Sequence, residues 1–276
     1  MTITIASAQA QIYSTPWENA EAACQLIAAA KQAGADLVHF PEGAFSGYVK
    51  QQIKHWDDVD WDALEHALLH ICTCAKDTGM WVVGGSNHRL TPPHWPHNSL
   101  LIIDSDGQLH TRYDKRFLSH TEVTNWYTPG SVPITFEVNG YTFGCAICIE
   151  VQFPEVFGEY RELGVDCVLL SSYSDSTMFG IQAQGHAACN NIWLSFSIPA
   201  QMSADCPSRI IGPSGELVAQ CAPNQAEVTL YTLDRDDPRW DIPLHKARPW
   251  RQKARAGNIY QSKHVTDPRS QARNKL

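Results

Sequence analysis

The sequence has no long apolar run and no leader-like beginning. No segment approaches the roughly 18 uninterrupted apolar residues that a membrane-spanning helix needs, so no membrane span is predicted. Residues 1–20 carry neither a positively charged start nor a long apolar core, which argues against a secretory signal. We therefore expect a cytoplasmic protein with no membrane partner.

Clusters of basic residues are also missing from most of the chain. The formal net charge is −8 and the pI about 5.8, and lysines and arginines do not gather until the tail. An acidic chain without a basic patch does not suit the phosphate backbone, so nucleic acid is not expected as a partner.

The sequence also lacks the compact cysteine spacing that is typical of disulfide-rich proteins. The nine cysteines are an odd number and show no compact spacing pattern. In a chain of 276 residues without a secretory signal, they are predicted to be free thiols in a reducing cytoplasm. The composition, 43% hydrophobic and 18% charged, is that of an ordinary globular protein with a sizeable core.

Strand-like and helix-like segments alternate along the chain, and no linker or low-complexity segment divides them. Asp106-Gly107 and Asn139-Gly140 indicate hairpin turns. Strands are predicted at residues 3–10, 36–40, 80–85, 165–174 and 192–200, hairpins at 98–115, 134–148 and 208–220, and helices at 14–35, 61–76, 154–164 and 179–191.

This alternation predicts a mixed sheet architecture with helices outside, α/β or α+β, in one domain over residues 1–276. The tail, from about 236 to 276, is irregular, aromatic and locally basic. We expect this tail to pack on its own body or on a sister subunit.

Three predicted strands end in a reactive side chain, which is where α/β proteins place active residues. Glu42 follows the strand at 36–40, Lys115 ends the hairpin at 98–115, and Cys148 ends the hairpin at 134–148. Each alone has an ordinary structural explanation: a solvated acid, a surface charge, a small buried hydrophobic residue. Their combination calls for another explanation.

The local contexts of these residues resemble the carbon–nitrogen hydrolase (nitrilase) superfamily over nearly the whole chain. The matching motifs are "FPEGAFSGY" around Glu42, "YDKRFL" around Lys115 and "GCAICIEVQFPE" around Cys148, in the family's order. Glu122, seven residues after Lys115, matches a second glutamate of the family. The resemblance implies a four-layer α-β-β-α sandwich and a homodimer or larger homo-oligomer.

The resemblance also implies a role for each of these residues. Cys148 would attack the carbonyl carbon as a thiolate, and Glu42 would take the thiol proton and later activate water. Lys115 and the backbone N–H of Ile149 would stabilise the oxyanion, with Glu122 orienting Lys115 or touching the substrate. No metal and no organic cofactor is required.

The pocket is where this sequence departs from the family. Tyr48 of the first motif, Tyr173 and Ser174 are expected to touch the substrate, and the last two stand where a tryptophan is frequent. His186 and Cys189 replace an arginine and a glutamate on the helix at 179–191. These changes concern substrate choice and subunit contacts more than the reaction.

A small linear amide or an N-carbamoyl compound is the first choice of substrate, and a nitrile is the alternative. The stretch "CIE" has the nitrilase-like Glu150 without the nitrilase tryptophan, so it does not decide between them. A catalytically idle, nitrilase-like scaffold is a further alternative. Cys145, on the opposite face of the strand from Cys148, is predicted to pack in the core, because a disulfide between the two would break the strand.

Two other kinds of site remain open. A Cys-His hydrolase could use His120 or His186 with Cys148, which the glutamate and lysine motifs make unnecessary. A structural zinc site would use histidines and cysteines that lack a matching distal pair, namely His66, His70, Cys72, Cys74, His94 and His97.

Overall fold

The computed structural model describes residues 1–274, which form two facing six-stranded sheets. The first sheet has the order β12-β1-β2-β3-β4-β5 and the second β11-β10-β9-β8-β7-β6. The strands of the first sheet are β1 (Thr2–Gln9), β2 (Leu37–His39), β3 (Trp81–His88), β4 (His97–Ile103), β5 (Leu109–Asp114) and β12 (Glu227–Asp234). Those of the second are β6 (Thr135–Val138), β7 (Tyr141–Ile147), β8 (Cys167–Ser171), β9 (Trp193–Ser197), β10 (Arg209–Ile211) and β11 (Leu217–Gln220).

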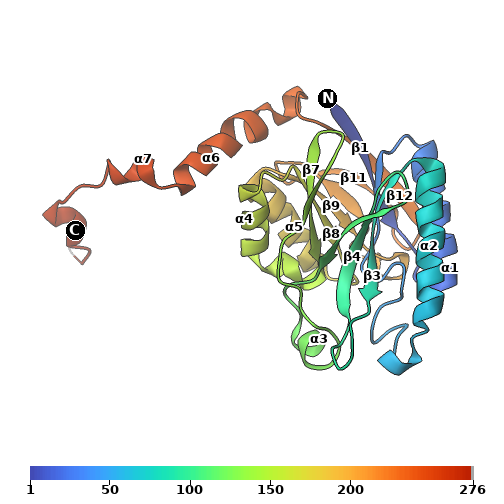
Figure 1. Ribbon diagram of the computed structural model, residues 1–276. Coiled ribbons are helices and arrows are strands. Elements are labelled where there is room, and N and C mark those ends of the chain that lie inside the picture. The colour runs from blue at the N-terminus through green and yellow to red at the C-terminus, as the bar shows by residue number, and fades with distance from the viewer. Residues whose placement is uncertain (275–276) are drawn as a thin grey trace.

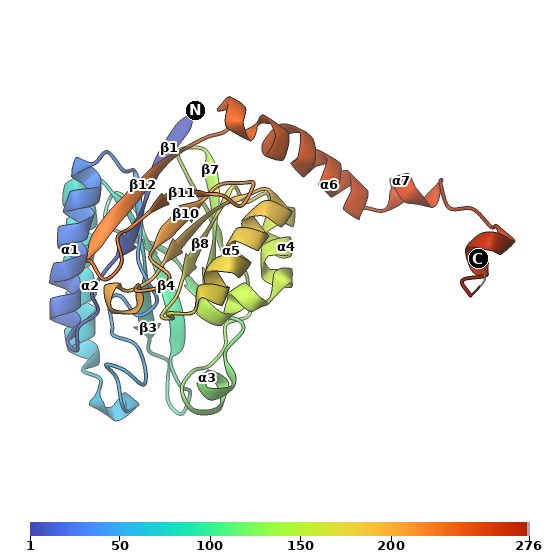
Figure 2. The same ribbon diagram turned by 180° about the vertical axis from the view of Figure 1, so that it is seen from behind.

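Helices cover the outer faces of both sheets. The α-helices are α1 (Pro16–Gln32), α2 (Trp61–Thr78), α3 (His120–Asn125), α4 (Pro154–Glu162), α5 (Thr177–Asn190), α6 (Arg248–Arg255), α7 (Asn258–Gln261) and α8 (Pro268–Gln271). Helices α1 and α2 lie on the first sheet, and α4 and α5 on the second (Figures 1 and 2). The predicted four-layer α-β-β-α sandwich is confirmed.

Both sheets are built on the same plan, three parallel strands extended by antiparallel ones. Strands β1, β2 and β3 are parallel in the first sheet, as are β7, β8 and β9 in the second. The hairpin β6–β7 turns at Asn139 and Gly140, which both have positive φ as the predicted tight turn requires.

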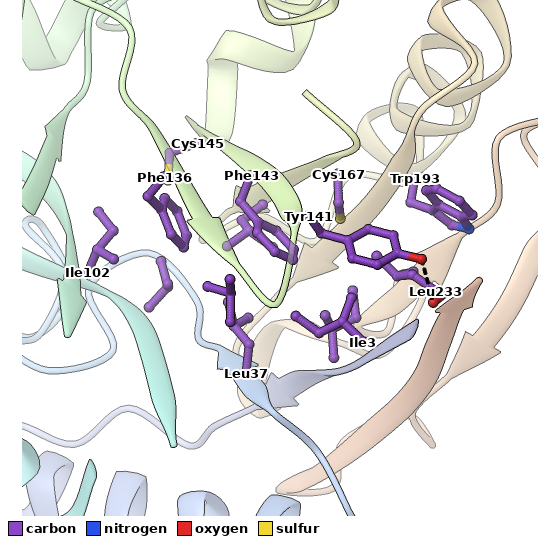
Figure 3. Packing of buried hydrophobic residues seen from close by; sticks show 14 of the residues in the cluster. Ile3, Leu37, Ile102, Phe136, Tyr141, Phe143, Cys145, Cys167, Trp193 and Leu233 are labelled. Carbon is purple, nitrogen blue, oxygen red and sulfur yellow. Dashed lines mark hydrogen bonds between the residues drawn. The ribbon is translucent and has the colours of Figure 1, made fainter. Parts of the chain in front are cut away.

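The largest apolar cluster fills the space between the sheets (Figure 3). Alternate residues of β7 point into it, so that Tyr141, Phe143 and Cys145 are completely buried there. The Tyr141 hydroxyl donates to the Leu233 carbonyl at 3.1 Å, which joins β7 of the second sheet to β12, the edge strand of the first. The prediction that Cys145 is a packing residue is confirmed.

The sequence prediction missed strand β12. Its residues pair antiparallel with β1 from Thr2↔Asp234 to Gln9↔Glu227, so the segment closes the edge of the first sheet. Its alternation "EVTLYTLD" was the available signal, and it is weak because this edge strand is half-exposed along most of its length. Only Leu233 of the strand is fully buried.

The tail was predicted to be irregular, and this is wrong for much of it. Trp240 is buried in the inter-sheet cluster, and α6 follows. The Arg251 guanidinium donates to the Ala188 carbonyl at 2.7 Å and to Asn191 Oδ1 at 2.9 Å, which fixes α6 at the end of α5. Beyond α6 the chain runs away from the body through α7 and α8 (Figure 1).

The expectation that every cysteine is a free thiol is also wrong. Cys24 of α1 and Cys74 of α2 form a disulfide, with Cα atoms 5.9 Å apart. The two residues are 50 positions apart in sequence and meet only because the helices pack side by side, so their spacing gave no signal. No helix within residues 1–274 has the length and apolar composition needed to span a membrane.

Candidate active site

Cys148 stands at a sharp turn directly after strand β7. Its φ is +52°, in the left-handed region that non-glycine residues seldom adopt, and a 3-10 turn over Cys148–Gln152 begins there. The residue therefore lies past the strand on which it was predicted. This turn ends the ladder and leaves the Cys148 side chain at the border of the inter-sheet cluster, partly buried against it.

Neighbouring groups shift the pKa of the Cys148 thiol in opposite directions. Burial raises its pKa to about 12, and the nearby carboxylate of Glu42 adds to that rise. The ammonium group of Lys115 works in the opposite direction and lowers the pKa of the thiol. In this state the thiol holds its proton, so nucleophilic attack requires a base close by.

Glu42 is held in the loop that follows β2. The loop lies directly on strand β3, since a Cβ at Gly85 would come within 2.3 Å of the Gly43 nitrogen and 2.7 Å of the Glu42 Cα. The Glu42 side chain is fully buried. Asn98 Nδ2 donates to its Oε1 at 2.7 Å, and the Tyr173 amide donates to its Oε2 at 2.9 Å.

Lys115 joins two buried carboxylates. Its Nζ lies 3.0 Å from Glu42 Oε1 and 2.8 Å from Glu122 Oε1, and its side chain has no exposed surface. Burial alone would lower the pKa of Lys115, but the two carboxylates outweigh it and raise that pKa well above its usual value. The Lys115 ammonium is thus shared between Glu42 and Glu122.

Glu122 is fixed by the first turn of α3. Ser119 caps this helix in a capping box, in which the Ser119 amide donates to Glu122 Oε2 at 2.7 Å. Burial would raise the pKa of Glu122, yet the Lys115 charge and the hydrogen bonds of Lys115 and Ser119 lower it. Glu122 therefore stays ionised and holds Lys115 in place.

Tyr48 and Tyr173 stack face to face beside these groups. Their ring centroids are 4.4 Å apart with an interplanar angle of 10°. Burial, followed by the Glu42 charge, raises the pKa of Tyr48, so its hydroxyl keeps its proton. Gln52 Nε2 donates to the Tyr173 hydroxyl at 3.2 Å and holds this second ring.

The other two expected pocket residues lie at turns. Ile149 is the second residue of the 3-10 turn, where backbone N–H groups have no partner within the helix. Ser174 lies after β8 and accepts from the Ser176 amide at 3.2 Å. Its hydroxyl is therefore engaged in the turn that leads into α5.

The family model described as carbon-nitrogen hydrolase matches residues 4–239. The chain belongs to the carbon-nitrogen hydrolase family. It is therefore a hydrolase of C–N bonds other than peptide bonds, as its ordered motifs indicated.

Individual relatives of this carbon-nitrogen hydrolase are distant. An omega-amidase of Bos taurus is 24% identical over 265 residues, covering 88% of this chain and 94% of its own. A probable nitrilase of Schizosaccharomyces pombe is 28% identical over 157 residues, covering 54% of this chain and 56% of its own. Amide hydrolysis is thus the better supported chemistry.

A solved structure with a similar fold is a mutant of the amidase from Nesterenkonia sp. AN1. It superposes with a TM-score of 0.76 at 21% identity, covering 90% of this chain and 99% of that chain. In that protein, acrylamide has undergone Michael addition at the active-site cysteine. At this identity the likeness establishes the fold.

Glu150 has a role in this hydrolase that the sequence did not reveal. We treated it as a mark of the substrate class, but its carboxylate is fully buried and turned to the backbone. It accepts from the amides of Ile147 at 2.7 Å, Arg116 at 2.8 Å and Phe117 at 3.1 Å. It therefore ties the segment after Lys115 to the turn that carries Cys148.

Asn98 and Ser172 were also missed. Asn98 is on β4, paired in register with Asn87 of β3, and only the folded sheet brings it to Glu42. Ser172 directly follows β8, which is parallel to β7, so the two strands end side by side near Cys148. Polar residues at strand ends were the available signal, but such residues are too common to be singled out.

Two histidines proposed as alternative bases are engaged elsewhere. His186 Nε2 lies 2.8 Å from the Val151 carbonyl, and its ring stacks on Phe157 with centroids 3.9 Å apart. His120 is exposed at the start of α3. Cys189 is exposed on α5, three residues after His186. A Cys-His pair with Cys148 is not part of this arrangement.

Proposed function

We propose that this hydrolase cleaves a small amide or N-carbamoyl compound through a thioester on Cys148. The observation that carries the proposal is the buried cluster of Lys115 between Glu42 and Glu122, directly beside the thiol. A buried ammonium flanked by two carboxylates costs desolvation free energy that a purely structural pair seldom requires.

The first half of the reaction transfers the acyl group. Glu42 takes the proton from the Cys148 thiol, and the thiolate attacks the carbonyl carbon. The oxyanion that forms is stabilised by the Lys115 charge and the Ile149 N–H, each worth roughly 10²–10³ in rate. The proton on Glu42 then passes to the nitrogen, the C–N bond breaks, and ammonia or an amine leaves.

The second half restores the enzyme. Glu42, again ionised, takes a proton from water, and the hydroxide attacks the thioester carbon. The C–S bond breaks, the acid is released, and the thiolate regains its proton. No step needs a metal or an organic cofactor.

The stacked tyrosines support a small substrate. Tyr48 and Tyr173 stand beside Glu42, stacked on each other as one flat apolar wall, and the Tyr48 hydroxyl is protonated. A linear amide with few heavy atoms suits a site beside such a wall. The omega-amidase name of a relative makes amides the first class to include in a substrate screen.

The test is a screen of short amides, N-carbamoyl amines and nitriles for ammonia release, together with mass spectrometry of the quenched protein. We expect turnover of an amide or carbamoyl compound and an acyl adduct on Cys148. Ammonia release from nitriles alone would indicate a nitrilase instead. If no class were turned over and Cys148 reacted with an electrophile no faster than Cys189, the idle scaffold would be the better explanation.

We also propose that the protein is a homo-oligomer, joined through the α5 face and the tail. Large apolar side chains are exposed there, with Ile181 68%, Trp250 55% and Tyr260 49% exposed. The tail leaves the body at α6, where a second copy could cover it (Figure 2). Light scattering should give a multiple of the 30.8 kDa chain mass, and a monomer would contradict the proposal.

A further inference from the structure

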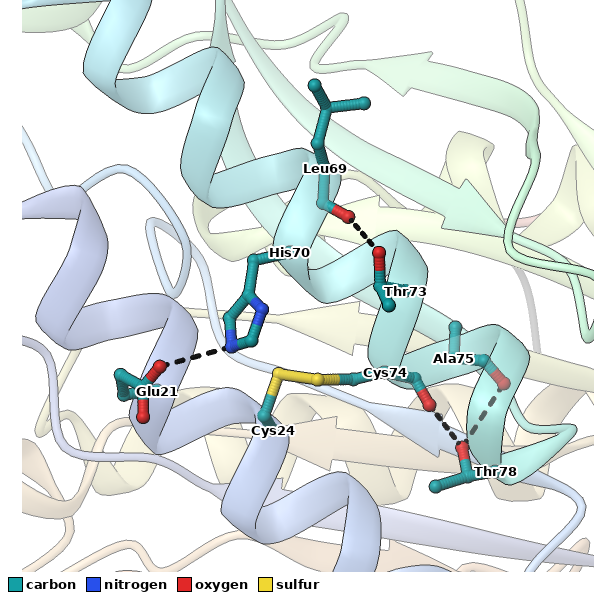
Figure 4. Close-up of a disulfide and its surroundings, with 8 residues drawn as sticks. All are labelled: Glu21, Cys24, Leu69, His70, Thr73, Cys74, Ala75 and Thr78. Carbon is teal, nitrogen blue, oxygen red and sulfur yellow. Dashed lines mark hydrogen bonds and ion pairs between the residues drawn. A yellow bond between two sulfur atoms is a disulfide. The ribbon is translucent and has the colours of Figure 1, made fainter.

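Helices α1 and α2 bring a set of metal-ligating side chains together, far along the chain from Cys148. Cys24, His70 and Cys74 each offer a ligand atom, and these atoms all lie within 4.8 Å of one another. Figure 4 shows the His70 ring between Glu21 and the two sulfur atoms. Among residues 1–274 this trio stands outside the groups used by the reaction.

Helix geometry explains why these residues converge. His70 and Cys74 are four residues apart on α2, so they share one face, and Glu21 and Cys24 are three apart on α1 and share another. The two faces meet in register, Glu21 opposite His70 and Cys24 opposite Cys74. Two pairs on facing helices can surround one ion.

The His70 ring is already oriented. Its Nε2 lies 3.1 Å from Glu21 Oε1, and Trp17 stacks on it with ring centroids 4.9 Å apart. A carboxylate on one ring nitrogen fixes the tautomer in which the other nitrogen, Nδ1, has the lone pair that a metal needs. Such a carboxylate–histidine pair is frequent behind zinc ligands.

We propose that Cys24, Cys74 and His70 form a binding site for a zinc-type divalent cation when the two cysteines are reduced. Two thiolates and one imidazole are a set that selects Zn²⁺ over Mg²⁺ or Ca²⁺. The His70 and Glu21 side chains are 32% and 50% exposed, so water can reach the fourth position. The site is independent of the proposed amidase reaction.

The disulfide and the metal exclude each other because both use the same sulfur atoms. A phosphine reductant with one water breaks the S–S bond, giving two thiols and a phosphine oxide. The cation then displaces the two thiol protons and forms two metal–sulfur bonds. Oxidation would reverse this and release the ion, so the site holds metal only in the reduced protein.

The test uses the full-length protein, stripped of metal and reduced with a phosphine. Titration with Co²⁺ should give one equivalent bound, with the absorption of thiolate-to-cobalt charge transfer, and Zn²⁺ should abolish this absorption. Cys24→Ser should remove the charge-transfer band, and His70→Ala should weaken binding at least tenfold. Zn²⁺ should raise the Tm of the reduced wild type but not of His70→Ala.

Matched controls lie on the same helix. His66 is exposed one turn before His70, and Cys72 is a free thiol two residues before Cys74. His66→Ala and Cys72→Ser should bind Co²⁺ within about twofold of the wild type, since neither belongs to the trio. A band that survives in Cys24→Ser, disappears equally in Cys72→Ser, or is as strong in the oxidised protein would overturn the proposal.

Discussion

Cys145 and Cys148 lie three residues apart and both are buried, yet the charged groups around them differ. Cys145 is inside β7, packed between the sheets, where burial holds the pKa of its thiol far above the usual value. Cys148 lies beyond the strand end, where Lys115 lowers the pKa that burial raises. Cys145 has no cation beside it, whereas Cys148 lies near both the Glu42 carboxylate and the Lys115 ammonium.

His39 and Glu42 repeat this contrast in the first sheet. His39 is completely buried between the sheets, with Nε2 2.8 Å from Ser171 Oγ and Nδ1 3.0 Å from Ser195 Oγ. Burial lowers its pKa to about 3, so the ring is neutral. Glu42, three residues later, is equally buried but lies against Lys115.

The difference shows how the charged partners of a buried group decide its chemistry. Between the sheets, His39 and Cys145 have no group of opposite charge beside them, and desolvation keeps both uncharged. At the strand ends, loops from different strands bring in opposite charges, which allow buried groups to remain ionised. We therefore expect the reactive groups of this molecule in the loops that follow the strands.

The sharpest test of the contrast is the cysteine pair. Cys148→Ala should abolish ammonia release, because no other thiol faces the Glu42–Lys115 cluster in the described chain. Cys145→Ala should keep turnover and lower the free energy of unfolding by about 1 kcal/mol, since it removes one buried sulfur. Wild-type turnover by Cys148→Ala would contradict the assignment of the nucleophile.

A second test removes the positive charge of Lys115, which lies beside Glu42 and Cys148 but not beside His39 or Cys145. Lys115→Met leaves Glu42 and Glu122 as buried carboxylates without a partner. We expect turnover to fall by about 10²–10³ and the free energy of unfolding to fall by about 3–5 kcal/mol. Urea unfolding and initial rates measure both, and Lys31→Met, on the exposed side of α1, should change neither.

If Lys115→Met kept its activity while losing stability, the lysine would be a structural cation alone. The contrast between the neutral interior and the charged loops after the strands would then concern folding and not catalysis. A loss of activity with unchanged stability would instead mean that the carboxylates take up protons in the variant and become neutral.

A third, smaller effect concerns Glu150, whose carboxylate ties the segment after Lys115 to the turn that carries Cys148. Glu150→Gln keeps the size of the side chain but weakens its contacts with the Ile147 and Arg116 amides. A displacement of about 1 Å between Lys115 and Cys148 would lower kcat by roughly 10²-fold. We expect kcat to fall with little change in KM. An equal change in KM would point to a substrate contact instead.

Much of the fold was predictable because local signals repeat along the chain. The limits of α1 follow from the Thr15 cap and from Gly34, and the β6–β7 turn from Asn139-Gly140. Strand β12 was not predicted, because its pairing with β1 across more than 200 residues leaves no local mark. The same holds for the contact between Cys24 and Cys74.

The site was predictable only in part, for a similar reason. Glu42, Lys115 and Cys148 stand in ordered motifs, and the structure brings them together at strand ends. The partners that hold them were not visible in the sequence. Asn98 reaches Glu42 through sheet register, and Glu150 binds amides of a distant loop. Such contacts depend on tertiary structure, not on residue type.

The last prediction concerns the neutral middle of the sandwich. Because the pKa of His39 is about 3 in the folded protein and 6.5 when unfolded, the unfolded state binds more protons between these values. The stability supplied by neutral His39 is complete above pH 6.5 and decreases as the pH falls. At pH 5 the free energy of unfolding should be about 2 kcal/mol lower than at pH 7.5.

His39→Gln isolates this term from other histidines, such as His186, whose pKa burial also lowers. The variant should be less stable at pH 7.5, since the bonds to Ser171 and Ser195 are weakened, but should lose about 2 kcal/mol less on going to pH 5. Urea unfolding at the two pH values measures both quantities. If both proteins lost the same free energy of unfolding between pH 7.5 and pH 5, His39 would accept a proton in the folded state. That would require a negatively charged partner between the sheets. The distinction between the neutral interior and the charged loops would then fail.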